Sequence, residues 1–216
     1  MVNEPAQASA ETPAQAPAKA LRADARRNRA RVLQVAAEVF AAEGLAVPVH
    51  EIARRAGVGT GTVSRHFPTK EELFAAVLLD RMAVLSAQAD ALAEGEDATT
   101  AFFTFFARLV HEGAAHRGLA ETLVGAGYDI DQAAAEHDCD VSARMNAMLL
   151  RAQRAGGVRE DVTYPDVKAL MTGCLSREPD PADADAGADA LSRLITVVSD
   201  GLRARANPAP RGQLPS

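Results

Sequence analysis

The stretch VHEIARRAGVGTGTVSRHFPTK, from Val49 to Lys70, decides the fold because its small, apolar and glycine positions suit two short helices that cross closely. Ala53 is small enough to let a second helix approach the first. Gly57 follows four residues later, where the chain must turn through a left-handed conformation that costs a residue with a Cβ about 1–2 kcal/mol. Val63 and Phe67, four residues apart, form the inward face of the second helix. The stretch therefore predicts a helix-turn-helix.

Further helices are predicted on both sides of this motif. After it, Thr69 can cap the amide of Glu72 at the start of a helix that runs towards Ala93. Before it, Asp24 can cap a helix that runs to Gly44. Apolar residues recur along this first helix at helical spacing, namely Val32, Leu33, Ala36, Val39 and Phe40. Four consecutive helices are therefore expected.

Charge is divided unevenly along the chain. The whole sequence has 23 basic and 29 acidic residues, a net charge of −6. The part from Lys19 to Arg81 has 11 basic and 7 acidic residues, net +4, whereas Met82 to Ser216 has 12 and 20, net −8. The basic charge thus surrounds the predicted motif, which favours a nucleic acid as the partner of this end. Five arginines crowd the start of the first helix, where they either reach phosphates or a minor groove or form a solvated face: Arg22, Arg26, Arg27, Arg29 and Arg31.

Two segments around the motif resemble a known family. RNRARVLQVAAEVFAAEG, at residues 27–44, and EIARRAGVGTGTVSRHFPTKEELF, at residues 51–74, are similar to the N-terminal domain of the TetR family of bacterial one-component transcriptional regulators. Two positions depart from the family pattern. Ser64 stands where relatives usually have a tyrosine that contacts the DNA backbone, and Pro48 stands where many have a Ser or Thr helix cap.

The resemblance implies an all-α protein with two domains. An N-terminal three-helix, helix-turn-helix DNA-binding domain is expected over residues 24–82, with its motif at about 49–68, and a C-terminal helical ligand-binding and dimerisation domain over residues 83–206. The Ala/Pro/Gln-rich residues 1–23 are expected to be a disordered tail, and residues 207–216 a flexible one. The implied function is a repressor that binds a palindromic double-stranded operator as a homodimer and is released by a small-molecule effector. The alternative is an effector-independent DNA-binding protein whose helical domain serves only dimerisation.

Nine residues are expected to contact DNA. Thr60 and Arg65, with Gly61 beside them, occupy the exposed turn and front of the recognition helix, and their side chains suit base edges. Residues better suited to phosphates are Thr62, Ser64, His66, Thr69 and Lys70. His50, at the start of the preceding helix, could add a groove or phosphate contact.

The second domain is expected to be helical throughout, with helices over roughly 119–125 and 131–155 among others. Four of the seven phenylalanines lie between Phe102 and Phe106. This cluster is either the core of the domain or the wall of an effector cavity. The residues expected to line such a pocket are Phe102, Phe103, Phe106, Leu109, Val110, Met145 and Met148.

The last two helices are expected to form a dimer interface. Thr163 to Asp166 has the pattern of a capping box at the start of the first of them. The interface predicted from the resemblance consists of Val167, Leu170, Met171, Cys174, Leu191, Leu194, Ile195, Val198 and Leu202. The apolar stripe on the final helix could equally be core within one subunit.

Several other classes of protein are not supported by the sequence. No stretch approaches the ~18–20 apolar residues that span a bilayer, and no signal-peptide pattern is present. Cys139 and Cys174 are expected to be reduced, buried thiols of a cytoplasmic protein. His137 to Asp140 holds metal-competent side chains, but neighbours on one helix point in different directions. Since no nucleophile elbow, phosphate loop or zinc-protease helix is present, we expect no enzyme activity, cofactor, metal or membrane partner.

Overall fold

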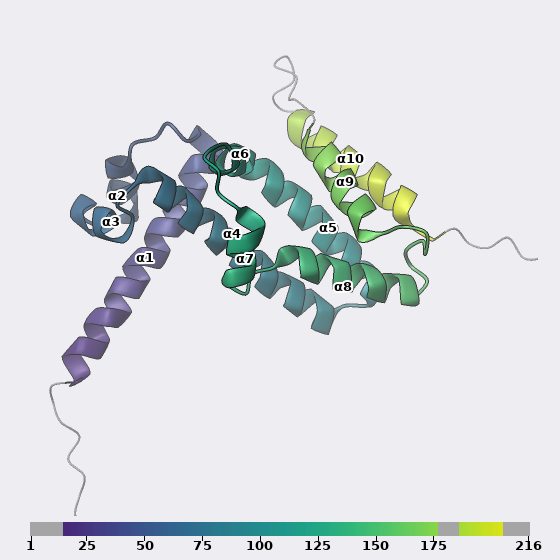
Figure 1. The fold of residues 1–216 in the computed structure, drawn as a ribbon, viewed down its shortest axis with the longest axis horizontal. Coiled ribbons are helices and arrows are strands. Elements are labelled where there is room, and N and C mark those ends of the chain that lie inside the picture. The colour runs from purple at the N-terminus through teal and green to yellow at the C-terminus, as the bar shows by residue number, and fades with distance from the viewer. Residues whose placement is uncertain (1–14, 177–185, 205–216) are drawn as a thin grey trace, which may run out of the picture. The chain divides into compact units, whose positions relative to one another are not determined.

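The computed structural model of the chain describes the backbone of residues 15–176 and 186–204, and side chains of residues 23–176 and 189–204. Within these ranges the regular elements are ten α-helices (Figure 1). One isolated β-bridge pairs Val158 with Arg203. The chain divides into two compact units, of which the first ends at Leu73 and the second begins at Phe74. The all-α fold expected from the sequence is confirmed.

The first unit is built from α1 (Gln15–Glu43), α2 (Val49–Ala56), α3 (Thr60–His66) and the first residues of α4 (Lys70–Gly95). Its core contains the apolar residues that the spacing placed inward: Val32, Leu33, Ala36, Val39, Phe40, Ile52, Ala53, Val63 and Phe67. Gly57 ends α2 in the left-handed region with φ 66°, and its N–H donates to the carbonyl of Arg54. The predicted helix-turn-helix is therefore present.

Helix α1 begins earlier than the sequence suggested. It starts at Gln15, nine residues before the predicted cap at Asp24, so residues 15–23 of the predicted disordered tail are helical. Alanine, the best helix former, supplies four of these nine residues, but the segment has no apolar periodicity to reveal a helix. The rest of that tail, residues 1–14, and the predicted flexible residues 207–216 lie outside the described residues.

The second unit contains most of α4 and six further helices. Asp97 caps the first of them by accepting hydrogen bonds from the N–H groups of Thr99 and Thr100, at 3.0 and 3.1 Å. The helices are α5 (Ala98–Ala115), α6 (Arg117–Gly125), α7 (Ile130–Glu136), α8 (Val141–Arg154), α9 (Tyr164–Leu175) and α10 (Ala186–Leu202). None of the helices in the described ranges has the length and apolar character needed to cross a membrane.

The long helix predicted over 131–155 is in fact two helices, α7 and α8. Asp138 breaks it with a φ of 53°, a left-handed conformation that Asp tolerates better than most residues. The N–H of Cys139 then donates to the carbonyl of Ala134 at 2.9 Å, and Asp140 caps α8 by accepting from the N–H of Ala143 at 2.9 Å. The left-handed turn at Asp138 and the cap that Asp140 provides therefore outweigh the continuous helical pattern.

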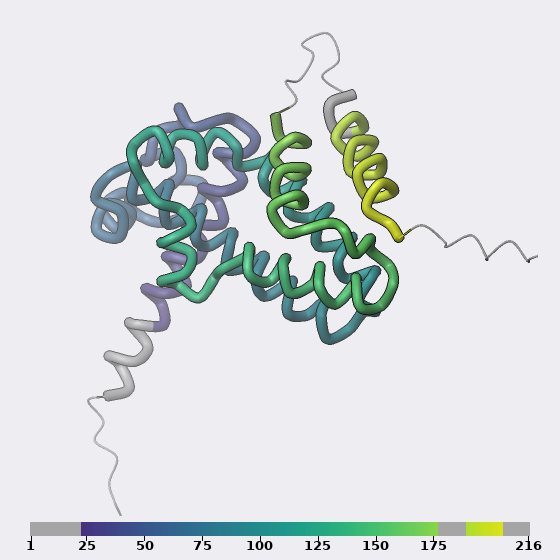
Figure 2. Tube along the Cα trace, turned by 45° about the vertical axis from the view of Figure 1, so that its right-hand side comes forward, coloured from purple at the N-terminus to yellow at the C-terminus, as the bar shows by residue number. Residues whose placement is uncertain are grey.

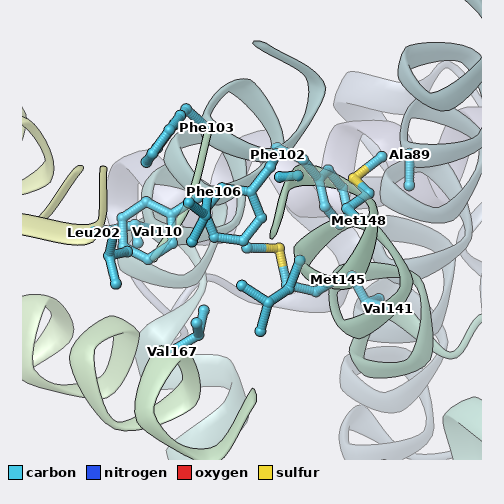
Figure 3. Packing of buried hydrophobic residues seen from close by; sticks show 14 of the residues in the cluster. Ala89, Phe102, Phe103, Phe106, Val110, Val141, Met145, Met148, Val167 and Leu202 are labelled. Carbon is cyan, nitrogen blue, oxygen red and sulfur yellow. The ribbon is translucent and has the colours of Figure 1, made fainter. Parts of the chain in front are cut away.

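Helix α5 is the centre of the second unit. It packs against α8, α9 and α10, and α9 and α10 lie side by side (Figure 2). The core that these helices share includes Phe102, Phe106, Val110, Met145, Met148, Val167 and Leu202 (Figure 3). Phe105 also belongs to it. Burial of this one large cluster supplies the main driving force for folding of the unit.

Candidate functional site

The nine residues predicted to contact DNA all lie at the surface of the helix-turn-helix or just after it. Seven are exposed, while Thr62 and Lys70 are half-buried. The recognition helix α3 turns its buried residue Val63 inward, and Phe67 directly after it is also buried. Thr60, Arg65 and the other polar residues of α3 are consequently directed away from the core.

The arginines of α2 are engaged by carboxylates. Glu51 accepts hydrogen bonds from Arg54, at 2.6 and 2.8 Å, and from Arg55 at 2.7 Å. Arg55 also pairs with Glu43 at the end of α1, with Nη2 and Oε2 3.1 Å apart. Hydrogen bonds from Arg54 and then Arg55 lower the pKa of Glu51 to about 2, so this carboxylate stays charged. These pairs partly neutralise α2 and connect it to α1.

Two arginines of α1 lie against the helix-turn-helix. The guanidinium carbon of Arg29 is 5.4 Å from the centre of the Phe67 ring, a cation–π contact at the end of α3. Arg31 lies beside the turn between α2 and α3, since its Nη1 would be 3.9 Å from a Cβ on Gly57. The sequence placed both residues in a basic cluster, but it gave no signal for these contacts, which join residues far apart in the chain.

The start of α4 agrees with the predicted cap. The Thr69 hydroxyl accepts a hydrogen bond from the N–H of Glu72 at 3.1 Å. Lys70 is the first residue of α4, and the N-terminus of a helix attracts anions through its backbone N–H groups.

The seven residues predicted to line an effector pocket come together. Six belong to the buried cluster of the second unit, and the half-buried Leu109 packs against it. The rings of Phe102 and Phe103 meet edge to face with centroids 5.0 Å apart, and Phe102 and Phe106 stack at 6.5 Å (Figure 3). Arg203 lies over the Phe103 ring, with its guanidinium carbon 4.3 Å from the ring centre. It stays a prediction that the seven residues line a cavity.

Most of the predicted dimer interface belongs to the core of the subunit itself. Val167, Cys174, Ile195 and Leu202 are members of the buried cluster, and Met171, Leu191, Leu194 and Val198 pack against it. The alternative that the sequence left open, an intramolecular stripe, therefore accounts for these side chains. Among the described side chains of this helix pair, the large apolar residues that remain exposed are Leu170 on α9, 39% exposed, and Val197 on α10, 67% exposed.

A charged cluster joins α4 to the end of α5; from the sequence, Glu112 and His116 were expected only as polar residues near the predicted pocket. Glu112 accepts a hydrogen bond from Arg81, and its Oε1 lies 3.3 Å from Nε2 of the buried His116. The His116 ring and then the Arg81 guanidinium lower the pKa of Glu112 to about 2, although burial acts against them. Only the long-range packing of α4 on α5 brings these three residues together.

The cysteines are the buried thiols that were expected. Cys139 and Cys174 are both free and both buried, and burial raises the pKa of each thiol. The described ranges contain no group of three or more His, Cys, Asp or Glu side chains that could hold a metal ion.

A helix-turn-helix with an exposed polar recognition helix, attached to a larger all-helical unit, defines a DNA-binding transcriptional regulator. Residues 32–77 match the profile of the bacterial regulatory proteins of the tetR family, and residues 97–204 match that of the C-terminal domain of SbtR-like transcriptional regulators. The chain belongs to the TetR family. Members of this family are transcriptional regulators and not enzymes.

Solved structures and a curated protein agree with this assignment. A TetR transcription regulatory protein from Mycobacterium vanbaalenii is 45% identical, with a TM-score of 0.67, over 85% of this chain and 99% of that one. The TetR transcriptional regulator SCO0520 from Streptomyces coelicolor is 31% identical, with a TM-score of 0.67, over 82% and 99% of the two chains. The uncharacterized HTH-type transcriptional regulator TtgW of Pseudomonas putida is 43% identical over 60 residues, which are 27% of this chain and 45% of that protein.

Proposed function

We propose that this protein is a repressor that binds a palindromic operator as a homodimer and is released from it by a small-molecule effector. The observation that carries the proposal is the orientation of α3, which buries Val63 and leaves Thr60 and Arg65 exposed. In the bound state, Thr60 and Arg65 read base edges beside Gly61. The phosphate contacts come from Thr62, Ser64, His66, Thr69 and Lys70, with His50 adding a groove or phosphate contact. Its operator would place the protein at the nucleoid, in the cytoplasm.

The homodimer follows from the symmetry of such an operator. A two-fold axis sets two recognition helices in successive major grooves, about 34–36 Å apart. We assign the interface to the outward face of α9 and α10, because Leu170 and Val197 are apolar and exposed there while the other predicted residues serve the subunit core. Val197 also lines a shallow surface groove with Ser192, Arg193 and Thr196. Burying these side chains against a second copy would remove them from water.

The effector would bind among the aromatic and thioether side chains between α5 and α8. Phe102, Phe106, Met145 and Met148 supply a large apolar surface, and methionine side chains adapt readily to an inserted ligand. The proposed effector is therefore a mainly apolar small molecule. Its binding would change the spacing of the two recognition helices and so lower operator affinity.

A genome-wide footprint of the tagged protein tests the proposal. We expect binding at sites with inverted repeats, increased transcription of the adjacent genes after deletion, and loss of the footprint when the effector is supplied. Decreased transcription after deletion would make the protein an activator. A footprint that no growth condition or apolar compound changes would favour the effector-independent alternative.

A further inference from the structure

Two buried polar atoms of the second unit have no hydrogen-bond partner among the described residues. They are Nδ1 of His116 and the hydroxyl oxygen of Ser86. The two side chains are only 9% and 4% exposed. Folded proteins pair almost all buried polar atoms, because an atom that has lost its water and gained no partner destabilises the fold. Both atoms lie in the unit to which the effector is assigned, and a ligand there would supply the partner that the described residues do not.

His116 lies at the end of a stripe that begins in the apolar cluster. It follows the last residue of α5, and its spacing places it on the same side of that helix as Phe105, Leu109 and Glu112. Phe105 belongs to the buried cluster, and Leu109 packs against it. A ligand whose apolar part contacts the cluster at this stripe can therefore extend a polar group towards the imidazole.

Ser86 lies on α4, level with the middle of the same stripe. Two contacts show that α4 and α5 run antiparallel beside each other. Arg81 of α4 donates a hydrogen bond to Glu112, near the end of α5. Further along α4, Gln88 accepts a hydrogen bond at 3.2 Å from Arg108, which comes earlier in α5. Ser86 lies between these two contacts along α4.

The two unpaired atoms are within reach of one small molecule. The level of Ser86 is about two helical turns from His116, which is about 10 Å along the axis of α5. Ser86 also borders the apolar cluster, because Leu85 and Ala89 of the same helix belong to that cluster. One ligand with an apolar frame and two separated polar groups could thus contact both residues.

The chemistry of the two residues indicates which polar groups fit. Oε1 of Glu112 lies 3.3 Å from Nε2 of His116, so the proton of the neutral ring stays on Nε2 and Nδ1 is an acceptor. The hydroxyl of Ser86 can donate or accept. A hydroxyl group on a ligand suits both residues, since it donates to Nδ1 and pairs with a serine in either sense. A carboxylate cannot donate to Nδ1, and it would approach the negative charge of Glu112.

We propose that the effector is an apolar molecule with hydroxyl groups, one of which donates to Nδ1 of His116 while another pairs with the hydroxyl of Ser86. The inference rests on the proposed function, because it assigns the polar contacts of the same effector. It makes His116 and Ser86 binding residues that select the ligand, in addition to the apolar side chains that surround its frame.

The test uses three fluorescent probes with one frame: naphthalene, 2-naphthol and 2,6-dihydroxynaphthalene. Each added hydroxyl should increase the affinity of the full-length wild-type protein by about three- to tenfold, because it completes one hydrogen bond. Ser86→Ala should bind the dihydroxy compound no more tightly than the wild type binds 2-naphthol. The variant without ligand should melt at the same or a higher temperature, since it loses an unpaired buried hydroxyl. A purely structural role for Ser86 predicts a lower melting temperature instead.

Two substitutions of His116 distinguish its ring nitrogens. His116→Gln keeps a polar group near the position of Nε2, beside Glu112, and removes Nδ1, so it should lose the gain from one hydroxyl. His116→Asn keeps a polar group near the position of Nδ1 and should retain that gain. His111→Gln changes an exposed histidine of α5 and is the matched control, for which wild-type affinities are expected. Circular dichroism should show the same helical signal for every variant.

The outcomes separate this inference from the proposed function. Equal affinities of the wild type for the three probes would overturn the hydroxyl contacts and leave an apolar effector in place. Loss of the gain in His116→Asn, with His116→Gln unchanged, would overturn the assignment to Nδ1. Failure of the wild type to bind any of the probes would contradict an effector site in this unit, and with it the proposed release by an effector.

Discussion

Gly157 lies so close to Thr99 that a Cβ atom on the glycine would stand 2.7 Å from the Cβ of the threonine. Gly157 follows α8 and Thr99 is in the first turn of α5, so the ends of the two central helices of the second unit meet here. We expect Gly157→Ala to lower the free energy of unfolding by about 1–3 kcal/mol, because the backbone must separate to admit a methyl group. Urea denaturation measures this. Gly118→Ala, in α6 with open space around it, is the control and should be neutral or stabilising by up to about 1 kcal/mol. Equal free energies of unfolding for the two variants would show that Thr99 and the backbone of Gly157 can move apart without loss of stability.

Glu112 should make the free energy of unfolding depend on pH in the acidic range. Its pKa in the folded protein is about 2, against an ordinary value of 4.5, so its contribution is present above pH 4.5 and is lost as the pH falls towards 2. We expect Glu112→Gln to destabilise the protein by about 1–2 kcal/mol at neutral pH, through lost hydrogen bonds to a charged group, and to match the wild type near pH 2. Thermal denaturation between pH 2 and 7 tests this. Glu121→Gln, an exposed carboxylate on α6, should follow the wild-type profile. A difference between Glu112→Gln and wild type that is independent of pH would contradict the assignment.

Lys70 should behave as a phosphate contact. Lys70→Ala should weaken binding to the operator and to a mixed-sequence duplex by the same factor and lower the salt slope by about one counterion for each subunit. Fluorescence anisotropy over a range of salt concentrations measures both quantities, with Arg154→Ala as the control. An unchanged slope would exclude the contact.

Arg65 should determine one position of the operator sequence. Arg65→Ala should reduce discrimination at one symmetric base pair by about 1–3 kcal/mol for each half-site, because a guanidinium on the exposed face of α3 is suited to guanine. Competition between operators that differ by single base pairs is the measurement. Arg54→Ala is the comparison, since Arg54 is held by Glu51, and it should leave discrimination unchanged. If every operator variant lost affinity equally, Arg65 would be a backbone contact.

A glutamate introduced on one face of α10 should affect dimerisation, whereas a glutamate on the other face should affect the stability of the subunit. Val197→Glu changes an exposed residue, so we expect it to separate the dimer, keep the helical signal and lower operator affinity by orders of magnitude. Leu194→Glu places its charge against the subunit core and should destabilise the subunit itself. Light scattering, circular dichroism and an operator shift assay together distinguish these effects. A dimeric Val197→Glu variant with normal operator binding would exclude this face as the interface.

The sequence by itself determined the elements whose signals lie within a few neighbouring residues. The left-handed Gly57, the Thr69 cap and the inward positions of Val63 and Phe67 are encoded locally, because capping and helical periodicity need only a short range of chain. The capping box at Thr163 is confirmed for the same reason, since its N–H and hydroxyl both donate to Asp166. These features sufficed to predict helices and a helix-turn-helix, and the resemblance to a known family added the regulator.

Only the tertiary structure decided which surfaces these elements share. The stripe containing Ile195 and Leu202 fits a partner copy and a subunit core equally well, because both bury the same kinds of side chain, and its orientation depends on how α10 packs against α5. The break at Asp138 was missed for a different reason: local hydrogen bonds there override a helical pattern that continues on both sides. The contact of Arg29 with Phe67 joins residues 38 positions apart, and no spacing rule reaches that far. Periodicity determines which side of a helix is apolar, whereas the packing of distant segments determines what that side faces.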